Sequence, residues 1–291
     1  MYNYDFLTAL KIEDALYYLD RLEKVKILAG GTDLIVNIHK KSSRLPHFDY
    51  LLDISNIEEL KFIALKKQFL EIGSLITHTQ LIEDTLIAKY FPILKFAAQT
   101  IGSPQIRNRG TIGGNIVNAS PAADLLPPLI ALKARVELVS PGGKRELTLT
   151  EFLSGPYQTK LQENELLTTI KIPLLNEGYL ANFQKIGRRK SLAIARLSLA
   201  LVTRIDSENI FQDSRIVPGS ATPYPQSFPV TEGAVNGKRT TDLNLEEIGE
   251  IIAKEMISIT GKRWSTPYKS KALSALVIRA LKEFISKAGT K

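Results

Sequence analysis

Short polar side chains and a glycine pair are concentrated in one stretch of the sequence, residues 111–124. Gly113 and Gly114 predict a turn in which backbone N–H groups approach a ligand without obstruction by side chains. A helix is expected to begin after this turn, with Ser120 as its N-cap and Pro121 as its first residue. This chemistry is typical of a bound phosphate or pyrophosphate, and a polar loop leading into a helix is the alternative. The polar side chains of the stretch are Thr111, Asn115, Asn118, Ser120 and Asp124.

A second glycine pair, Gly30 and Gly31, follows a predicted buried strand at 25–28 and precedes a predicted helix at 34–38. Strand, glycine turn and helix in this order direct a helix N-terminus and free amides toward an anion, although a plain strand–helix connection is also compatible. The pattern is neither a P-loop nor the Gly-x-Gly-x-x-Gly of dinucleotide folds. Two such turns in one domain could hold the two phosphates of a dinucleotide. Arg107 and Arg109 could face phosphate oxygens or solvent.

The composition excludes several other kinds of site. The 291 residues include no cysteine, which removes disulfides, cysteine nucleophiles and self-ligated iron–sulfur clusters. The three histidines lack the spacing of a metal-binding helix, so no metal site is expected. The net charge of +8 is spread along the chain, which favours a solvated surface or a docking face for an acidic protein over nucleic acid. With no apolar run long enough to span a membrane and no secretory signal, we expect a cytoplasmic protein.

The elements that position these residues follow from hydrophobic spacing and turn signals. Pro173-Leu174-Leu175-Asn176-Glu177-Gly178 breaks the pattern and predicts a boundary between domains at 1–173 and 179–287. Strands followed by helices in the second part predict an α+β fold. Helices are expected at 11–21, 77–84, 92–101, 245–259 and from Thr266 to the C-terminal region, with the helix from Ser120 continuing to 132. Strands are expected at 50–54, 62–65, 69–73, 135–139, 144–149, 165–172, 181–186 and 197–204, and an ordered loop at 218–229.

Three stretches resemble signatures of the FAD-binding subunit of molybdenum hydroxylases, a family that includes medium subunits of aerobic carbon monoxide dehydrogenase and bacterial xanthine dehydrogenase. They are Ala29-Gly30-Gly31-Thr32-Asp33-Leu34, the segment 105–124, and the segment 183–195 in the second domain. Together with the total length, they extend the resemblance over essentially the whole chain. The resemblance implies an N-terminal FAD-binding domain of the vanillyl-alcohol-oxidase (PCMH) type in two subdomains. A smaller C-terminal α+β domain, an antiparallel sheet with helices, would follow it.

The resemblance also implies a set of cofactor-binding residues. Both glycine turns would bind the FAD pyrophosphate, and Ser120 and Asp124 would lie toward the flavin and its ribityl chain. Leu167 and Gln184 fall where related subunits touch the isoalloxazine or adenine side, and Gln184 occupies a place that is often lysine. The full set is Lys26, Ile27, Leu28, Ala29, Gly30, Gly31, Thr32, Asp33, Leu34, Ile101, Gly102, Arg107, Thr111, Ile112, Gly113, Gly114, Asn115, Asn118, Ser120, Asp124, Leu167 and Gln184.

The function implied by the resemblance is that of an oxidoreductase subunit that transfers electrons. A molybdenum-cofactor large subunit and an iron–sulfur small subunit would be its partners in a hetero-oligomer. Electrons would arrive from the iron–sulfur subunit and leave to NAD, a quinone, a ferredoxin or oxygen. No catalytic acid, base or nucleophile of this chain would be needed, because the cofactor carries the reactivity. A self-contained flavin oxidase or reductase, and a non-enzymatic protein that retains the fold, remain as alternatives.

Overall fold

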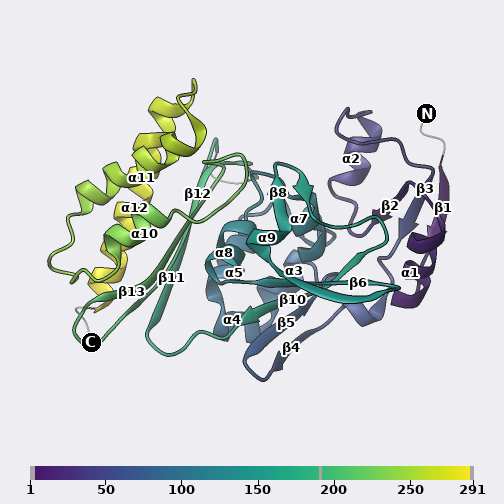
Figure 1. The fold of residues 1–291 in the computed structure, drawn as a ribbon, viewed down its shortest axis with the longest axis horizontal. Helices are drawn as coiled ribbons and strands as arrows, with labels where there is room; N and C mark the ends of the chain where they lie inside the picture. The colour runs from purple at the N-terminus through teal and green to yellow at the C-terminus, as the bar shows by residue number, and fades with distance from the viewer. Residues whose placement is uncertain (1–3, 190–191, 289–291) are drawn as a thin grey trace.

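The computed structural model describes residues 4–189 and 192–288, so positions 190 and 191 of the third signature, and residues 1–3 of the first predicted domain, lie outside the described part. Figure 1 shows the N-terminal elements at one end of an elongated molecule and the C-terminal helices at the other. Between them lie a five-stranded sheet with its covering helices and a second, three-stranded antiparallel sheet. The structure confirms the predicted α+β class.

The N-terminal subdomain is a small parallel sheet of three strands in the order β1-β3-β2. Helix α1 packs on it through Ala15 and Leu19, which lie four residues apart on one face and are both buried. The predicted helix, buried strand and strand–glycine–helix unit are all present. The elements are β1 (Asp5–Thr8), α1 (Ile12–Arg21), β2 (Val25–Leu28), α2 (Leu34–His39), β3 (Tyr50–Asp53) and the 3₁₀ turn η1 (Glu58–Leu60).

The second subdomain is an antiparallel sheet in the order β4-β5-β10-β6-β7, covered by short helices. The strands expected at 62–65 and 69–73, and those expected at 135–139 and 144–149, are present and pair with each other as two hairpins. Its strands are β4 (Ile63–Lys66), β5 (Phe69–Gly73), β6 (Arg135–Ser140), β7 (Gly143–Thr148) and β10 (Leu166–Pro173), with a separate hairpin of β8 (Leu153–Gly155) and β9 (Gln158–Thr159). Its helices are α3 (His78–Glu83), α4 (Thr85–Tyr90), α5 (Pro92–Gln99), α6 (Pro104–Arg107), α7 (Ile112–Asn118), α8 (Leu126–Ala131) and α9 (Leu149–Phe152).

The expected turn at Gly113 and Gly114 is wrong, because these glycines belong to the first turn of helix α7. Thr111 is the N-cap, and its hydroxyl accepts a hydrogen bond from the Gly114 amide at 3.0 Å. Ser120 caps a short turn instead of a helix: its hydroxyl accepts from the Ala122 amide at 3.3 Å. Helix α8 starts separately at Leu126, with prolines in its first turn. The Ser-Pro signal therefore marks the loop between two helices.

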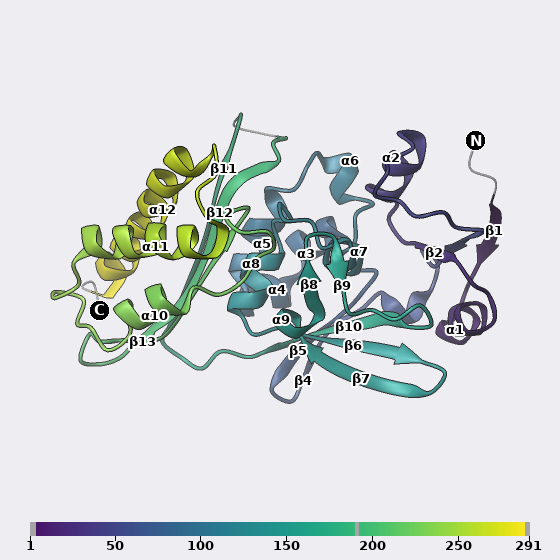
Figure 2. The same ribbon diagram turned by 45° about the horizontal axis from the view of Figure 1, so that its top comes forward.

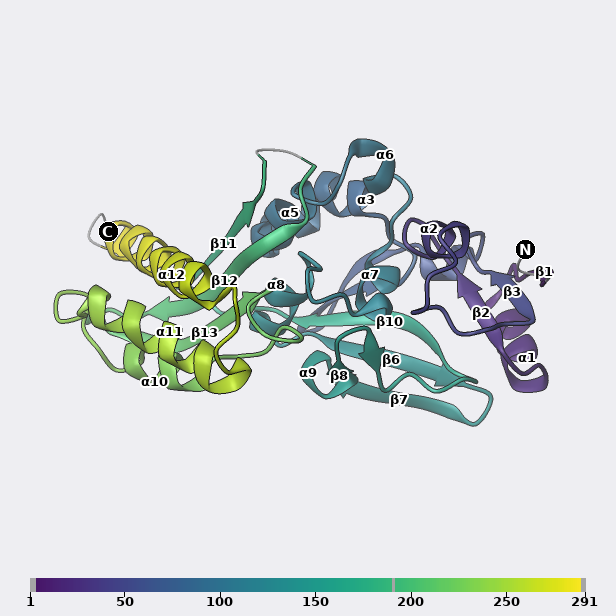
Figure 3. The same ribbon diagram turned by 90° about the horizontal axis from the view of Figure 1, so that it is seen from above.

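The C-terminal part is the sheet β11-β12-β13 with three helices on one face. In Figure 3 this sheet lies between α12 on one side and α5 and α8 on the other. Strand β13 was missed, because a bulge at Asp213, whose φ is 47°, interrupts its hydrophobic alternation. The elements are β11 (Tyr179–Gly187), β12 (Ala195–Ile205), β13 (Phe211–Gly219), α10 (Pro229–Val235), α11 (Leu245–Thr260) and α12 (Thr266–Ala288).

The two faces of this sheet belong to different hydrophobic cores. Ala181 and Phe183 of β11 pack against the core of the second subdomain, whereas Leu180 and Ile186 pack against the core under α11 and α12. This follows from strand geometry, since successive side chains point to opposite faces. The C-terminal sheet is therefore a shared wall of both cores.

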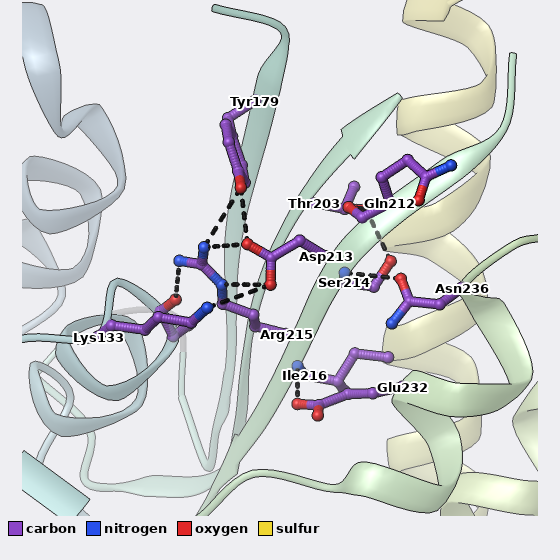
Figure 4. Close-up of polar contacts among 11 residues, drawn as sticks. Lys133, Tyr179, Thr203, Gln212, Asp213, Ser214, Arg215, Ile216, Glu232 and Asn236 are labelled. Carbon is purple, nitrogen blue, oxygen red and sulfur yellow. Dashed lines mark hydrogen bonds and ion pairs between the residues drawn. The ribbon is translucent and has the colours of Figure 1, made fainter. Parts of the chain in front are cut away.

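A polar cluster centred on Asp213 connects the C-terminal sheet to the second subdomain (Figure 4). Tyr179 donates its hydroxyl to Asp213 at 2.6 Å, and Lys133 from the second subdomain pairs with the same carboxylate at 3.3 Å. Arg215 also pairs with Asp213 and donates to the carbonyl of Ala131 at 3.0 Å. Burial alone would raise the pKa of the Asp213 carboxyl, but the hydrogen bonds and charges of these partners outweigh it and hold that pKa well below its ordinary value.

Asp213→Asn tests the contribution of this cluster to stability. A lowered folded-state pKa stabilises the folded protein above the unfolded pKa near 4, and this stabilisation is lost as the pH falls. We expect the variant to lower the free energy of unfolding by about 1 kcal/mol at pH 7, because the carboxyl is partly exposed and screened. Urea unfolding at pH 7 and pH 3 measures the difference, which should shrink at the lower pH. Glu208→Gln, in an exposed pair 3.7 Å from Arg239, is the control and should change little.

Candidate functional site

The two glycine motifs touch each other through their backbones. A Cβ atom on Gly30 would lie 1.9 Å from the carbonyl oxygen of Arg109, which no side chain can tolerate. A Cβ on Gly113 would lie 2.6 Å from the Cβ of Ser74. Both glycines are therefore required for close packing of the chain. Gly30 allows the loop before α2 to lie directly against the segment that leads into α7, and Gly113 allows α7 to lie against the segment at Ser74.

The loop between β2 and α2 presents unused backbone donors. Within the part of the chain that the structure describes, the N–H groups of Gly30, Gly31, Thr32 and Asp33 donate no hydrogen bond. Gly31 has a φ of 72°, a left-handed conformation that favours glycine. Successive free amides in a glycine turn at a helix start form an anion-binding concavity. This loop has the chemistry predicted for a phosphate site.

Helix α7 does not provide the free backbone amides that were expected at Gly113 and Gly114. The amides of Gly113 and Gly114 are already used, by the carbonyl of Ser74 at 2.9 Å and the hydroxyl of Thr111 at 3.0 Å, so they do not offer free donors. Gly114 is exposed, and a Cβ on it would meet nothing within 4 Å except the Thr111 hydroxyl. At Gly114 a ligand could therefore approach the helix backbone directly, beside the polar side chains of Asn115 and Asn118.

Buried polar atoms without partners gather around the same place. Among the described residues they are the hydroxyl of Ser74, Nδ1 of His78, and one side-chain oxygen each of Asn115 and Asp124. Ser74 and His78 were not predicted; their segment runs alongside Gly110–Gly113, with the His78 amide donating to the Gly110 carbonyl at 3.0 Å. Each unpaired buried group costs roughly 1–3 kcal/mol. A polar ligand that carries hydroxyls and phosphates could supply the missing partners.

Burial lowers the pKa of His78 to about 4, and the charge of Arg107 lowers it in the same direction. The imidazole is therefore neutral at neutral pH. The guanidinium of Arg107 donates to the carbonyls of Ile101 and Gly102 at 2.9 and 3.0 Å. Arg107, a cofactor-binding residue in the set that the resemblance implies, holds the turn after α5 through these bonds.

A buried ion pair reaches this turn from the C-terminal sheet. Lys185 of β11 contacts a carboxylate oxygen of Asp124 at 2.6 Å and donates to the carbonyl of Thr100 at 2.9 Å. Burial raises the pKa of Asp124 from 3.8 to about 6, and the ammonium of Lys185 partly opposes the rise. The site is therefore completed by a residue from beyond the predicted domain boundary.

Gln184 does not join the other predicted residues. It faces α12, where it accepts from Arg279 and donates to Asn182 at 2.9 Å. Its neighbour Lys185 points to the opposite face of β11, toward Asp124. The sequence interpretation missed Lys185, although the alternation along β11, with Ala181 and Phe183 facing the core of the second subdomain, carries the signal.

The remaining predicted residues surround the same motifs or pack beneath them. Lys26, Ile27 and Leu28 form β2 before the free-amide loop, and burial lowers the pKa of Lys26. Leu167 is buried in the core at a bulge of β10. Asn118 ends α7, and the Ser120 hydroxyl lies 3.5 Å from the hydroxyl of Tyr157.

Comparison with known proteins assigns the family. Residues 2–175 match the family described as the FAD binding domain in molybdopterin dehydrogenase, and residues 182–284 match the CO dehydrogenase flavoprotein C-terminal domain. This chain belongs to the FAD-binding subunits of the molybdenum hydroxylases. Its cofactor is FAD, and it is an oxidoreductase subunit, as the resemblance implied.

Similar proteins match along nearly the whole length. The glyceraldehyde dehydrogenase medium chain of Sulfolobus acidocaldarius is 30% identical, covering 97% of this chain and 98% of its own. The xanthine dehydrogenase FAD-binding subunit of Escherichia coli O157:H7 is 31% identical, covering 97% and 96%. A solved carbon monoxide dehydrogenase from Hydrogenophaga pseudoflava, which lacks the Mo-pyranopterin moiety of its cofactor, has a matching chain with a TM-score of 0.87 at 28% identity, covering 96% of each chain.

Neither a metal site nor the cavity beside Asp213 provides a second candidate site among the described residues. No group of three or more histidine, aspartate or glutamate residues in this part could hold a metal ion. A cavity of about 390 Å³ lies where the second subdomain meets the C-terminal sheet. It is lined in part by Lys133, Asp213 and Arg215, and both of these cations already pair with the Asp213 carboxylate. No helix in the described ranges is long and apolar enough to span a membrane.

Lys185→Met is expected to raise the pKa of Asp124 further above about 6, because burial would then act without the opposing ammonium. A raised carboxyl pKa also means that the cofactor-free protein loses stability as the pH rises through this range. Carbon-detected NMR titration of the carboxyl groups in the cofactor-free protein measures the pKa. Gln184→Met changes the neighbouring residue on the other face of β11 and should leave it unchanged. An unaltered Asp124 titration in Lys185→Met would contradict the pairing.

Proposed function

We propose that this chain is the electron-transfer subunit of a molybdenum hydroxylase complex. It would take electrons from an iron–sulfur subunit and pass them to an external acceptor such as NAD, while a molybdenum-cofactor large subunit oxidises the substrate. FAD, when bound, supplies the redox chemistry of this subunit. The similarity to medium chains and FAD-binding subunits along nearly the whole length supports the proposal.

The observation that carries the cofactor-binding part is the row of free amides at Gly30–Asp33, held against the start of α7. We propose that this loop binds the FAD pyrophosphate, and that Asn115, Asn118, Ser120 and Asp124 hydrogen-bond along the cofactor. The unpaired atoms of Asn115 and Asp124 fit this role. Lys185 would fix the Asp124 carboxylate, and Arg107 would hold the Ile101–Gly102 turn beside it.

The domain limits 1–173 and 179–287 form part of the proposal. The two family matches cover residues 2–175 and 182–284. The short segment between them would be the connection between the domains. The protein's own side chains would bind the cofactor, orient it and limit access of water. They would not carry out acid–base chemistry on an organic substrate.

Gly114→Val tests the cofactor site. A branched side chain would fill the open surface over α7, so we expect FAD affinity to fall roughly tenfold or more, equivalent to about 1.4 kcal/mol per factor of ten. Flavin fluorescence titration of the cofactor-free protein measures the dissociation constant. Gly233→Val in α10 is the control, since that glycine is also helical and a Cβ on it would meet nothing within 4 Å, whereas a Cβ on Gly114 would lie 3.0 Å from the Thr111 hydroxyl. The melting temperature of both cofactor-free variants shows whether this contact disturbs the fold. Equal FAD affinity in both variants would show that α7 is not the cofactor surface.

Reconstitution tests the electron-transfer role. The purified chain loaded with FAD should oxidise none of the substrates of the complex in the presence of an artificial acceptor. The activity should appear when the chain is co-expressed with a molybdenum-cofactor subunit and an iron–sulfur subunit. Substrate turnover by the isolated, FAD-loaded chain would favour a self-contained flavin oxidase or reductase instead, and failure to bind FAD would refute the proposal.

A further inference from the structure

Tyr157, which no sequence motif singled out, lies at the tip of the β8–β9 hairpin against the end of α7. Figure 2 shows this hairpin near α7. The amide of Tyr157 donates to the carbonyl of Ala119 at 2.9 Å. The Ser120 hydroxyl donates to the Tyr157 hydroxyl oxygen at 3.5 Å. The hairpin tip is thus bonded to Ala119 and Ser120, the two residues that follow α7.

Both partners in this contact have unusual backbones. Tyr157 has a φ of 60° and Ala119 a φ of 44°, in the left-handed region that residues with a Cβ rarely adopt. Such conformations persist where the surroundings over-determine them, and they concentrate at ligand clamps and switch regions. The backbone from which the Tyr157 ring projects is therefore closely defined.

Arg44 reaches the face of this ring from the loop that follows α2. Its guanidinium carbon lies 4.6 Å from the centroid of Tyr157. Arg44 belongs to the loop after α2, and that loop is tied to the helix because the Ser42 amide donates to the Asn37 carbonyl at 3.0 Å. The Arg44 amide in turn donates to the Ser42 hydroxyl at 3.3 Å. Arg44 therefore moves with α2 and with the free-amide loop before it.

The elements that carry the two motifs are thus joined on both sides of α2. Before α2, Gly30 packs against the carbonyl of Arg109; after it, Arg44 stacks on Tyr157. We propose that Arg44 and Tyr157 form a clasp that holds α2 against α7 and slows the release of FAD. This inference rests on the proposed placement of FAD between the two motifs. Both residues are positioning residues, because they act on the cofactor through the helices they join.

Arg21 and Tyr17 form another cation–π pair, but both residues belong to the same helix. Arg21 lies over the ring of Tyr17 at the same 4.6 Å, four residues away within α1. An exposed cation–π contact of this kind has a modest strength wherever it occurs. Of these two pairs, Arg44–Tyr157 connects segments that are far apart in the sequence and carry the two motifs, so its loss and not that of Arg21–Tyr17 should affect the cofactor.

The experiment compares FAD dissociation rates in Arg44→Gln, Tyr157→Leu and Tyr157→Phe, followed by the rise in flavin fluorescence on dilution of the loaded chain. We expect the first two to release FAD about two- to fivefold faster, in line with the strength of an exposed cation–π contact. Tyr157→Phe keeps the ring face and should rescue the slow rate. The double variant Arg44→Gln/Tyr157→Leu should be no faster than either single variant. Arg21→Gln and Tyr17→Leu should match the unaltered protein.

Unchanged rates in both Arg44→Gln and Tyr157→Leu, in a chain that binds FAD, would overturn the clasp and leave the proposed function intact. A Tyr157→Phe variant as fast as Tyr157→Leu would also overturn it, because the hydroxyl and not the ring would then be responsible. The melting temperature of the cofactor-free variants provides the structural readout: a fall there with no change in FAD release would likewise count against the clasp. A chain that binds no FAD at all would refute the proposed function itself.

Discussion

The absence of a side chain at residue 30 permits the backbone contact on which the site depends. With the Arg109 carbonyl in the space that a Cβ would occupy, the loop before α2 lies against the segment before α7. This contact turns two remote motifs into one surface, with free amides on one side and polar side chains on the other. A larger residue at this position would separate the two subdomains and remove the concavity without altering any polar group.

The C-terminal sheet extends the same surface. Because side chains alternate along β11, one face packs into the core beside α5 and α8 while the other packs under α12. Lys185 lies on the first of these faces and reaches Asp124. The sheet therefore serves as structural support for both domains, and it also delivers the cation that lies beside the most strongly perturbed carboxyl of the cofactor region.

Local patterns predicted the secondary structure around Gly30 and Gly31 better than that around Gly113 and Gly114. The strand, glycine pair and helix around Gly31 follow from local geometry and were predicted correctly. The start of α7 was misplaced because the glycine pair was interpreted as a turn, although the Thr111 cap on the Gly114 amide is local in sequence. The bond from the Gly113 amide to the Ser74 carbonyl is remote in sequence and gives no local signal. Gln184 was chosen in place of Lys185 because the family pattern does not fix which face of β11 is inward. Ser74 and His78 carry no local signal and become visible only when the chain is folded.

The Lys185–Asp124 pair has a consequence for how this protein could be inherited and recombined. A gene fragment that encodes only the first domain would retain the carboxylate and lose its cation, and a transplanted second domain would need a lysine in the same register of its edge strand. Shuffling of either domain among related genes is therefore restricted to partners that preserve this register. The two halves have to change together.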